Sequence, residues 1–268
     1  MSQEITPYLD ETHIGKIARR LPQAIQERGK EIRTFMPKYG NINERRHQLH
    51  EVIRLSGMNI VINNADHPLI IKVASIPTAR MQVYFIDNDD YFQRKSVLTD
   101  KATGKYFDDN DERAIFFNRG VIETVKKLGW APDVIHCHGW FTGLMPIYIK
   151  KAFAEDPLFS DTKIIFTVYD EEYTKALNKK VVDKAIIDGI SKKDLKHLED
   201  ASYVNLMKLA IDNSDGIAFG SESINPEVEK YAKKSGKPVL EYKGEAVYTD
   251  AYNEFYDLVL EDSEVLAD

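Results

Sequence analysis

Three residues that could contact a ligand follow two predicted strands of this sequence. His138 and Trp140 come at the end of an apolar run over residues 133–137, and Tyr169 follows a run over residues 163–168. Both runs have the length and composition of buried strands, and parallel sheets bind their ligands at the carboxyl ends of the strands. A sugar face could stack on the indole, while imidazole and phenol groups hydrogen-bond hydroxyls. Core packing is an equally good interpretation of Trp140.

The consecutive residues His136, Cys137 and His138 could suggest a metal site. Neighbours on a strand point to opposite faces, so the three side chains cannot converge on one ion. We expect His136 to point the other way along the strand and to be a buried histidine with satisfied hydrogen bonds. Cys137 is interpreted as a small buried hydrophobic residue rather than a nucleophile. The sequence therefore predicts no metal and no cofactor.

The acidic run over residues 170–172 follows the second of these strands. Its carboxylates could bind sugar hydroxyls, but a solvated loop is the better interpretation of such a charge run.

The strands that carry these residues belong to a repeated pattern of helix and strand. Apolar side chains recur at helical spacing early in the chain, four β-type runs follow without a helix between them, and helices and strands then alternate to the C-terminus. This pattern predicts an α/β fold with a doubly wound, mainly parallel Rossmann-like sheet and an antiparallel β excursion. The expected helices are 14–26, 109–125, 144–153, 203–211, 226–234 and 250–260; the expected strands are 32–36, 52–55, 58–62, 69–74, 81–86, 133–137, 163–168, 216–219 and 238–242.

Two further expectations concern the organisation of the chain. No linker composition interrupts it, so we expect residues 1–268 to form one domain. A doubly wound sheet normally begins with an apolar central strand, and only Met1 to Ile5 precede the first helix. We expect the first strand to be encoded upstream of Met1, or its place to be filled by another segment.

Composition limits the partners of the protein. The formal net charge is −7, which disfavours nucleic acid because duplex binding needs a basic face. The apolar stretches fall short of the roughly 20 residues that cross a bilayer. The single cysteine cannot form an internal disulfide, and the N-terminus lacks the features of a signal peptide. We expect a cytoplasmic protein that binds neither nucleic acid nor membrane.

Five strings together resemble the N-terminal, acceptor-side domain of bacterial glycogen synthases and plant starch synthases of the ADP-glucose type. The most specific pair is the helix signature that begins Asp109-Asn110 and the strand that ends His138-Gly139-Trp140. The others are Glu4-Ile5-Thr6-Pro7 with a helix ending Leu21-Pro22-Gln23-Ala24-Ile25, Gly29 to Arg33 leading to Met36-Pro37-Lys38-Tyr39-Gly40, and Asn205 with Lys208, Ile211, Asp215 and Ser221. The likeness covers nearly the whole chain.

The resemblance implies one half of a two-domain GT-B glycosyltransferase. In the family the N-terminal half holds the acceptor glucan, and the C-terminal half holds most of the nucleotide sugar. Only 47 residues follow Ser221, so we expect the donor domain to be absent and a second chain to be a candidate for supplying it. No G-x-G-x-x-G follows a strand, which argues against a nicotinamide oxidoreductase.

This sequence departs from the family at the donor loop. The resemblance implies a lysine and two glycines that approach a diphosphate, and an ungapped alignment places Asp10, Glu11, Thr12 and His13 at this degenerate loop. Two carboxylates would repel a diphosphate. Phe141 occupies the place of a sugar-contacting histidine, and a phenyl ring cannot hydrogen-bond a hydroxyl. A helix N-terminus capped by Asp10 or Thr12 is the better interpretation of the first segment.

Two hypotheses follow from the resemblance. The first is glucosyl transfer from ADP-glucose to an α-1,4-glucan, of which this chain supplies the acceptor-side half. The second is a non-catalytic glucan-binding or regulatory subunit with a degenerate donor site. In both, His138, Trp140 and Tyr169 are the candidate glucan contacts, the catalytic residues are unknown, and we expect no transfer by the chain alone.

Overall fold

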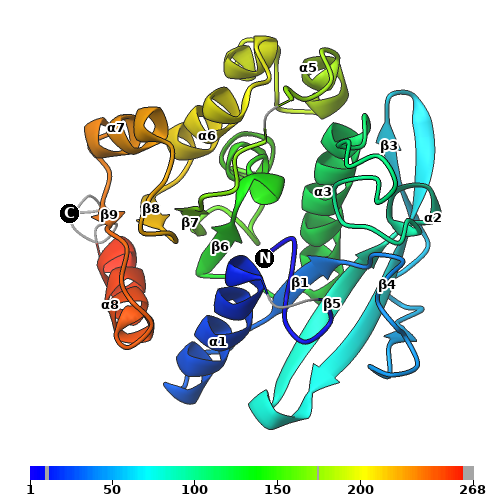
Figure 1. Cartoon of the computed structure of the whole chain (residues 1–268), viewed down its shortest axis with the longest axis horizontal. Coiled ribbons are helices and arrows are strands. Elements are labelled where there is room, and N and C mark those ends of the chain that lie inside the picture. The colour runs from blue at the N-terminus through cyan, green and yellow to red at the C-terminus, as the bar shows by residue number, and fades with distance from the viewer. Residues whose placement is uncertain (10–11, 174, 262–268) are drawn as a thin grey trace. The chain divides into compact units, whose positions relative to one another are not determined.

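The computed structural model describes residues 1–9, 12–173 and 175–261. The chain divides into two compact units, Met1–Gly129 with Leu177–Ile186 and Trp130–Ala176 with Ile187–Asp268. Each unit has its own hydrogen-bonded sheet and its own helices (Figure 1). Among the residues that the structure describes, every helix is too short or too polar to cross a bilayer. That residues 1–268 form a single domain stays a prediction.

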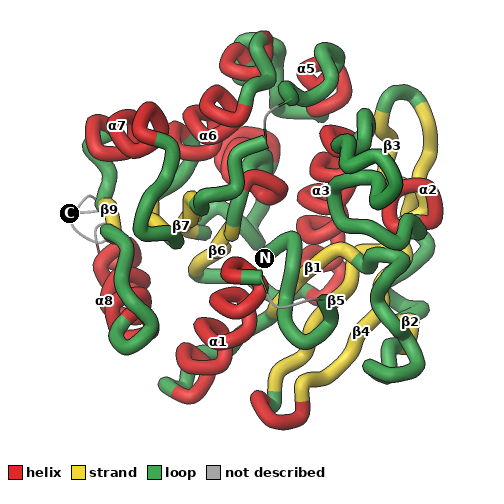
Figure 2. The backbone as a smooth tube through the Cα atoms, viewed as in Figure 1, coloured by secondary structure: helices red, strands yellow, loops and turns green. Residues whose placement is uncertain are grey.

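The sheet of the first unit contains the predicted antiparallel excursion. Strands β1 (Thr34–Pro37) and β5 (Met81–Asp87) are parallel, whereas β4 (Ala65–Ile76) runs antiparallel to β5. The short β2 (His50–Glu51) and β3 (Met58–Ile62) both pair with β4. Between β1 and β3 the chain is mostly loop (Figure 2). Because β1 and β5 are parallel, this loop begins at the edge where β5 ends.

Successive side chains of the first sheet point to opposite faces, and each face is covered by other parts of the unit. Ile86 of β5 lies against α3 (Asn110–Leu128), where a Cβ added at Gly120 would lie 2.7 Å from Ile86 Cγ2. The adjacent Phe85 contacts the ring of Tyr8, in the segment before α1 (His13–Glu27). Glycine at position 120 therefore allows the close packing of α3 on the sheet. The remaining helices of this unit are η1 (Pro77–Ala79), α2 (Asp89–Phe92) and α5 (Val181–Ala185).

A buried ion pair holds α5 to the first turn of α3. Lys184 Nζ lies 2.8 Å from Asp111 Oδ2 and 2.7 Å from Glu112 Oε1, and both Lys184 and Asp111 are buried. Burial raises the pKa of Asp111, and the lysine opposes that shift. Breaking such a pair leaves a buried charge uncompensated, so this contact fixes residues 177–186 within the first unit.

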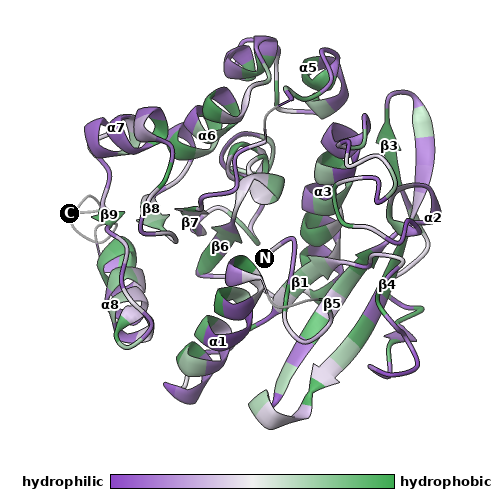
Figure 3. Cartoon of the chain, viewed as in Figure 1, coloured by the Kyte–Doolittle hydropathy of each residue, from purple (hydrophilic) through white to green (hydrophobic). Residues whose placement is uncertain are grey.

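The sheet of the second unit is entirely parallel, with the strand order β6 (Val134–His138), β7 (Lys163–Val168), β8 (Gly216–Phe219) and β9 (Val239–Leu240). This confirms that 133–137, 163–168 and 216–219 are neighbouring parallel strands. Figure 3 shows hydrophobic colouring on β6 and the hydrophilic colouring of α7 (Pro226–Lys234). The other helices are η2 (Trp140–Thr142), α4 (Met145–Ile147), η3 (Tyr148–Ala152), η4 (Lys196–Glu199), α6 (Tyr203–Asp212) and α8 (Tyr248–Glu261).

Helices on both faces make this a doubly wound sheet. α6 packs against β7. α8 covers the face of the sheet on which Gly216 and Thr167 lie. A Cβ at Gly216 would lie 2.8 Å from Val259 of α8, and the hydroxyls of Thr167 and Tyr252 are 3.2 Å apart. The predicted fold class, α/β with a parallel sheet and an antiparallel excursion, is confirmed.

Three expected elements differ from the structure. The run 52–55 is a turn, in which the Leu55 N–H donates to the Val52 carbonyl. Leu55 is buried, whereas Ile53 is 83% exposed. The helix expected over 144–153 consists of α4 followed by a π-helix, and the strand expected over 238–242 pairs only at β9. Before α1, the Ser2 N–H donates to the Phe35 carbonyl of β1 at 3.1 Å.

Candidate functional site

The three predicted glucan contacts lie together at the carboxyl ends of β6 and β7. His138 Nδ1 is hydrogen-bonded to the Tyr169 hydroxyl at 2.8 Å, and the Tyr169 carbonyl accepts a hydrogen bond from the Tyr203 hydroxyl at 2.9 Å. The two strands are adjacent and parallel, which is why residues 31 positions apart meet. His138 is 4% exposed and Tyr169 3% exposed. Burial raises the pKa of the Tyr169 phenol well above its usual value, so the group is neutral.

Trp140 is held by its own unit on several sides. Its backbone N–H donates to Glu171 Oε1 at 2.7 Å. Its indole makes edge contacts with Phe141 and Tyr173 at centroid distances of 5.3 and 5.0 Å. The side chain is 1% exposed. These are the contacts of core packing, the second of its two interpretations, and a sugar could stack on the indole only after Tyr173 or another neighbour moved.

His136 lies on the same side of β6 as His138, which corrects the expectation that it points the other way. The two ring centroids are 3.9 Å apart, because residues i and i+2 of a strand share a face. Nδ1 of His136 is 2.6 Å from the Tyr256 hydroxyl, and Nε2 is 2.7 Å from the Thr167 hydroxyl. His136 is half-buried, and both of its ring nitrogens have a partner, so the prediction of satisfied hydrogen bonds is confirmed.

Burial determines the protonation of this cluster. It lowers the pKa of both His136 and His138 well below the usual histidine value, and for His138 the neighbouring His136 adds to the effect. Burial raises the pKa of the Cys137 thiol to about 12. A protonated, fully buried thiol is a poor nucleophile, which confirms the interpretation of Cys137 as a small hydrophobic residue.

The acidic run after β7 is a loop, as expected, but one carboxylate has a structural role. Asp170 and Glu172 are exposed, and Glu172 Oε2 accepts a hydrogen bond from Asn225 Nδ2 at 2.9 Å. Glu171 is half-buried and accepts the Trp140 N–H. No local pattern indicates that role, since Glu171 and Trp140 are 31 positions apart.

In the first unit the segment resembling a donor loop begins helix α1. Thr12 is the N-cap: its Oγ1 accepts from the Gly15 N–H at 3.0 Å and donates to Glu4 Oε2 at 2.5 Å. His13 is the first helical residue, while Asp10 and Glu11 lie outside the described residues. Of the two cap candidates named above, Thr12 is confirmed.

Gly15 allows the chain itself to approach the start of α1. Its carbonyl accepts the Thr6 N–H at 3.2 Å, and a Cβ at this position would lie 2.9 Å from Thr12 Oγ1 and 3.3 Å from Thr6 Oγ1. Thr6 and Thr12 therefore fill the space through which a ligand would approach the backbone of Gly15.

A cavity of about 390 Å³ beside this segment was missed by the sequence analysis. It lies where the loop after β1 meets the segment before α1, and the ring of Tyr8 contacts His47 at a centroid distance of 5.0 Å. Burial raises the pKa of the Tyr8 phenol to about 12, with Arg19 opposing the shift. The lining residues are Thr6, Pro7, Tyr8, Leu9, Asn41, Asn43, Arg46 and His47.

The chemistry of this cavity suits binding rather than catalysis. Amide, imidazole and guanidinium groups can hydrogen-bond hydroxyls or anions, and none of the described residues that line the cavity is a carboxylate or a thiol. The pattern Asn41-Ile42-Asn43, in the loop that follows the predicted strand 32–36, was the signal that could have indicated it.

A network of lysines and carboxylates anchors the loop that lines this cavity. Glu44 Oε1 lies 2.6 Å from Lys38 Nζ and 2.8 Å from Lys72 Nζ, and Lys72 also reaches Asp87 Oδ2 at 3.0 Å. Burial raises the pKa of Asp87, with Lys72 opposing it. Burial also raises the pKa of Glu44, but the hydrogen bonds from Lys38 and Lys72 lower it more, so the pKa lies below its usual value. The loop is thus tied to the ends of β1 and β5.

Replacing Thr12 by alanine is expected to destabilise the protein by about 1 kcal/mol, because one helical N–H loses its acceptor and Glu4 loses a donor. Chemical denaturation followed by circular dichroism measures the change. Thr12→Ser keeps the hydroxyl and should retain most of the stability. Equal unfolding midpoints for Thr12→Ala and the parent chain would contradict the capping role.

Comparison with known proteins gives a consistent result. Residues 1–241 match the family described as the starch synthase catalytic domain. The chain is 39% identical over 191 residues to a glycogen synthase of Chlorobium limicola, covering 71% of this chain and 39% of that protein. It is 34% identical over 222 residues to a glycogen synthase of Chlorobium luteolum, covering 83% and 45%. The chain thus spans less than half the length of these curated relatives.

A solved structure shares the fold. The catalytic domain of starch synthase IV from Arabidopsis thaliana, bound to ADP and acarbose, matches with a TM-score of 0.72 and 18% identity, covering 90% of this chain and 50% of that one.

Proposed function

Because this chain belongs to the starch synthase catalytic domain family, which its similarity to bacterial glycogen synthases also reflects, we propose that it acts in glucosyl transfer during glycogen or starch synthesis. The match of residues 1–241 to that family carries the proposal. The solved relative binds ADP and acarbose, which supports an α-glucan as the ligand class of this chain.

The finer proposal is that the chain supplies the acceptor-side half and does not transfer glucose alone. Phe141, at the place of the family's sugar-contacting histidine, is fully buried against Trp140 and offers no polar group. At the start of α1, Thr12 and Thr6 occupy the approach to Gly15. Transfer needs groups aimed at the sugar and its leaving diphosphate, so this proposal requires a donor-binding domain besides residues 1–268.

A non-catalytic glucan-binding or regulatory subunit is the second candidate. The same two observations, the buried phenyl ring and the capped helix, favour it. We propose glucan contacts at the cavity of the first unit lined by Asn41, Asn43 and His47. In the second unit, His138, Trp140 and Tyr169 stay candidate glucan contacts.

The purified chain is expected not to transfer glucose from ADP-glucose to glycogen, because the start of α1 is occupied by its own cap. A radiolabel transfer assay measures this, with the Chlorobium limicola glycogen synthase as positive control. Calorimetric titration with a maltooligosaccharide should still show weak binding, on the order of millimolar. Turnover comparable to that of the control enzyme would refute the acceptor-half proposal.

The position of glucan binding is tested by a matched pair of variants. Asn43→Ala removes an amide from the cavity, whereas Asn59→Ala removes an exposed amide from β3 in the same unit. Loss of one hydrogen bond should weaken maltooligosaccharide binding by roughly 2-fold to 10-fold for Asn43→Ala alone. Equal affinities for both variants would place the glucan elsewhere.

A further inference from the structure

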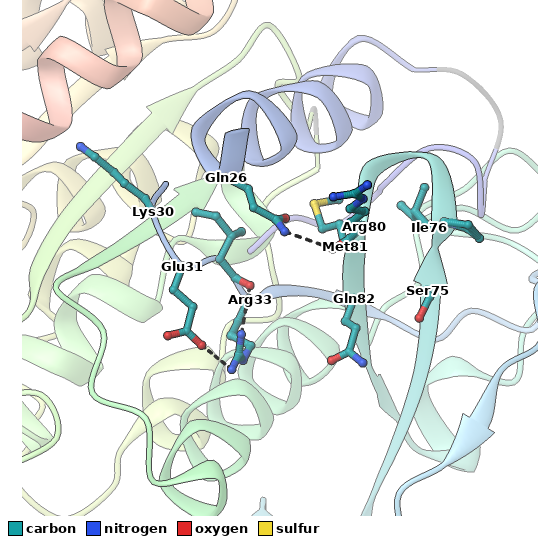
Figure 4. A pocket seen from close by; sticks show the side chains of 11 residues that line it. Gln26, Lys30, Glu31, Arg33, Ser75, Ile76, Arg80, Met81 and Gln82 are labelled. Atoms are coloured by element: carbon teal, nitrogen blue, oxygen red, sulfur yellow. Dashed lines mark hydrogen bonds and ion pairs between the residues drawn. The ribbon is translucent and has the colours of Figure 1, made fainter. Parts of the chain in front are cut away.

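A second cavity, of about 410 Å³, opens in the first unit between the end of α1 and the turn that joins β4 to β5 (Figure 4). Its volume falls within the range of about 300–1,000 Å³ usual for small-molecule sites. The lining residues are Gln26, Lys30, Glu31, Ile32, Arg33, Ser75, Ile76, Pro77, Arg80, Met81 and Gln82.

This cavity lies at the opposite end of the strands from the proposed glucan cavity. The glucan cavity borders the loop after Pro37, the last residue of β1, whereas the second cavity is lined by residues 30–33, just before β1 begins. Met81 and Gln82 likewise begin β5, which is parallel to β1. A ligand here would bind the amino ends of both strands, away from the edge at which such folds bind substrates.

The charge of the cavity favours an anion. Three cationic side chains line it, from Lys30, Arg33 and Arg80, and only one carboxylate, from Glu31. The lining therefore has a formal charge of +2 within a chain whose net charge is −7. Glu31 Oε1 pairs with Arg33 at 2.5 Å, and in Figure 4 the Lys30 side chain extends away from the two arginines. Arg80 is thus the cation best placed to contact an anion in this cavity.

Arg80 occupies a backbone conformation that is costly for an arginine. Its φ of 49° and ψ of 34° lie in the left-handed region, where glycine or asparagine is usual. The turn is held by its own N–H, which donates to the Pro77 carbonyl at 3.1 Å, and by Gln26 Nε2, which donates to the Arg80 carbonyl at 3.1 Å. Among the described residues no carboxylate pairs with its guanidinium. A strained arginine at a cavity wall is typical of a functional position.

The other residues that line the cavity favour an anion that also carries a carbon skeleton and hydroxyl groups. Half-buried Ile32 and exposed Pro77 give the cavity an apolar side, while Gln26, Ser75 and Gln82 contribute neutral polar groups. An apolar surface beside amide and hydroxyl groups suits the carbon face and hydroxyls of a sugar or polyol. Guanidinium groups bind phosphate through two parallel hydrogen bonds.

We propose that this cavity binds a phosphate monoester of a sugar or small polyol, with Arg80 as its main phosphate contact. The site is separate from the proposed glucan cavity and does not depend on the proposed function. A ligand bound there would contact α1 and the starts of β1 and β5 rather than their carboxyl ends.

Isothermal titration of the full chain with glucose 1-phosphate, inorganic phosphate and glucose tests the proposal. Glucose 1-phosphate should bind more tightly than inorganic phosphate, and glucose should not bind at this cavity. Arg80→Gln should weaken binding of glucose 1-phosphate by at least about 10-fold, as expected for loss of a charge-assisted hydrogen bond. Arg54→Gln, an exposed arginine in the 52–55 turn outside the cavity, should bind as the parent chain does.

A second variant separates binding from folding. Arg80→Gly removes the same side chain but relaxes the left-handed backbone, so its unfolding temperature should be unchanged or raised while binding is lost. Equal affinity of the parent chain and Arg80→Gly for glucose 1-phosphate would overturn the proposal. So would absence of binding by the parent chain, or equal affinity for inorganic phosphate and glucose 1-phosphate.

Discussion

Acidification from about pH 7.5 to about pH 5.5 is expected to lower the free energy of unfolding by roughly 2 to 3 kcal/mol through His136 and His138. Burial lowers the pKa of both histidines well below the value of about 6.5 that they have in the unfolded chain. Above that pH both states are neutral and the pair contributes no pH dependence. Below it the unfolded chain takes up protons that the folded chain does not, so stability falls by about 1.4 kcal/mol per pH unit for each histidine.

The groups that face the two rings support this direction. From β7 the partners are Thr167 and Tyr169, and from α8 the partner is Tyr256, with Tyr252 bonded to Thr167. Burial raises the pKa of Tyr169, Tyr252 and Tyr256, so these hydroxyls stay neutral and supply no negative charge to an imidazolium. Two protonated rings 3.9 Å apart would also repel each other.

Urea denaturation at several pH values measures this effect. His138→Gln should remove about half of the histidine contribution to the pH dependence of the unfolding free energy, whereas His50→Gln, at an exposed position, should leave that dependence unchanged. The raised pKa values of Asp87 and Asp111 act in the opposite direction, because these carboxylates are stabilised on protonation in the folded state. Both variants keep Asp87 and Asp111, so the contribution of these carboxylates cancels when the pH dependence of His138→Gln is compared with that of His50→Gln. Equal pH dependence in His138→Gln and His50→Gln would contradict the prediction.

Replacing Trp140 by alanine is expected to destabilise the protein by about 3 to 5 kcal/mol, since the indole is 1% exposed and its removal leaves a large cavity. Its edge contacts with Phe141 and Tyr173 would be lost as well. The same denaturation experiment measures the change, which is a large part of the 5–15 kcal/mol typical of a folded domain.

The other tryptophan provides the control for this variant. Trp130 is half-buried, so Trp130→Ala should cost less than Trp140→Ala. A loss of stability below about 1 kcal/mol in Trp140→Ala, together with loss of maltooligosaccharide binding, would contradict core packing and indicate direct contact with the sugar.

The sequence by itself determined the elements and much of their arrangement. The 3.6-residue spacing of apolar side chains located α1, which the structure places at His13–Glu27, and short apolar runs located β6, β7 and β8. These signals are local, because each depends on one face of one element being buried. Parallel pairing of the strands then brought His138 and Tyr169 to one edge, as their positions at the strand ends predicted.

Tertiary structure alone decided which of these residues are accessible and what they contact. Trp140 is enclosed by Tyr173 and Phe141, and His136 is hydrogen-bonded to Tyr256, 120 residues further along the chain. The turn at 52–55 has strand composition, but no neighbouring element covers Ile53. Both cavities are formed by segments distant in sequence, and the left-handed backbone of Arg80 follows from the β4–β5 turn and the amide of Gln26. Burial and cavity formation depend on packing between distant segments, which residue type and periodicity do not encode.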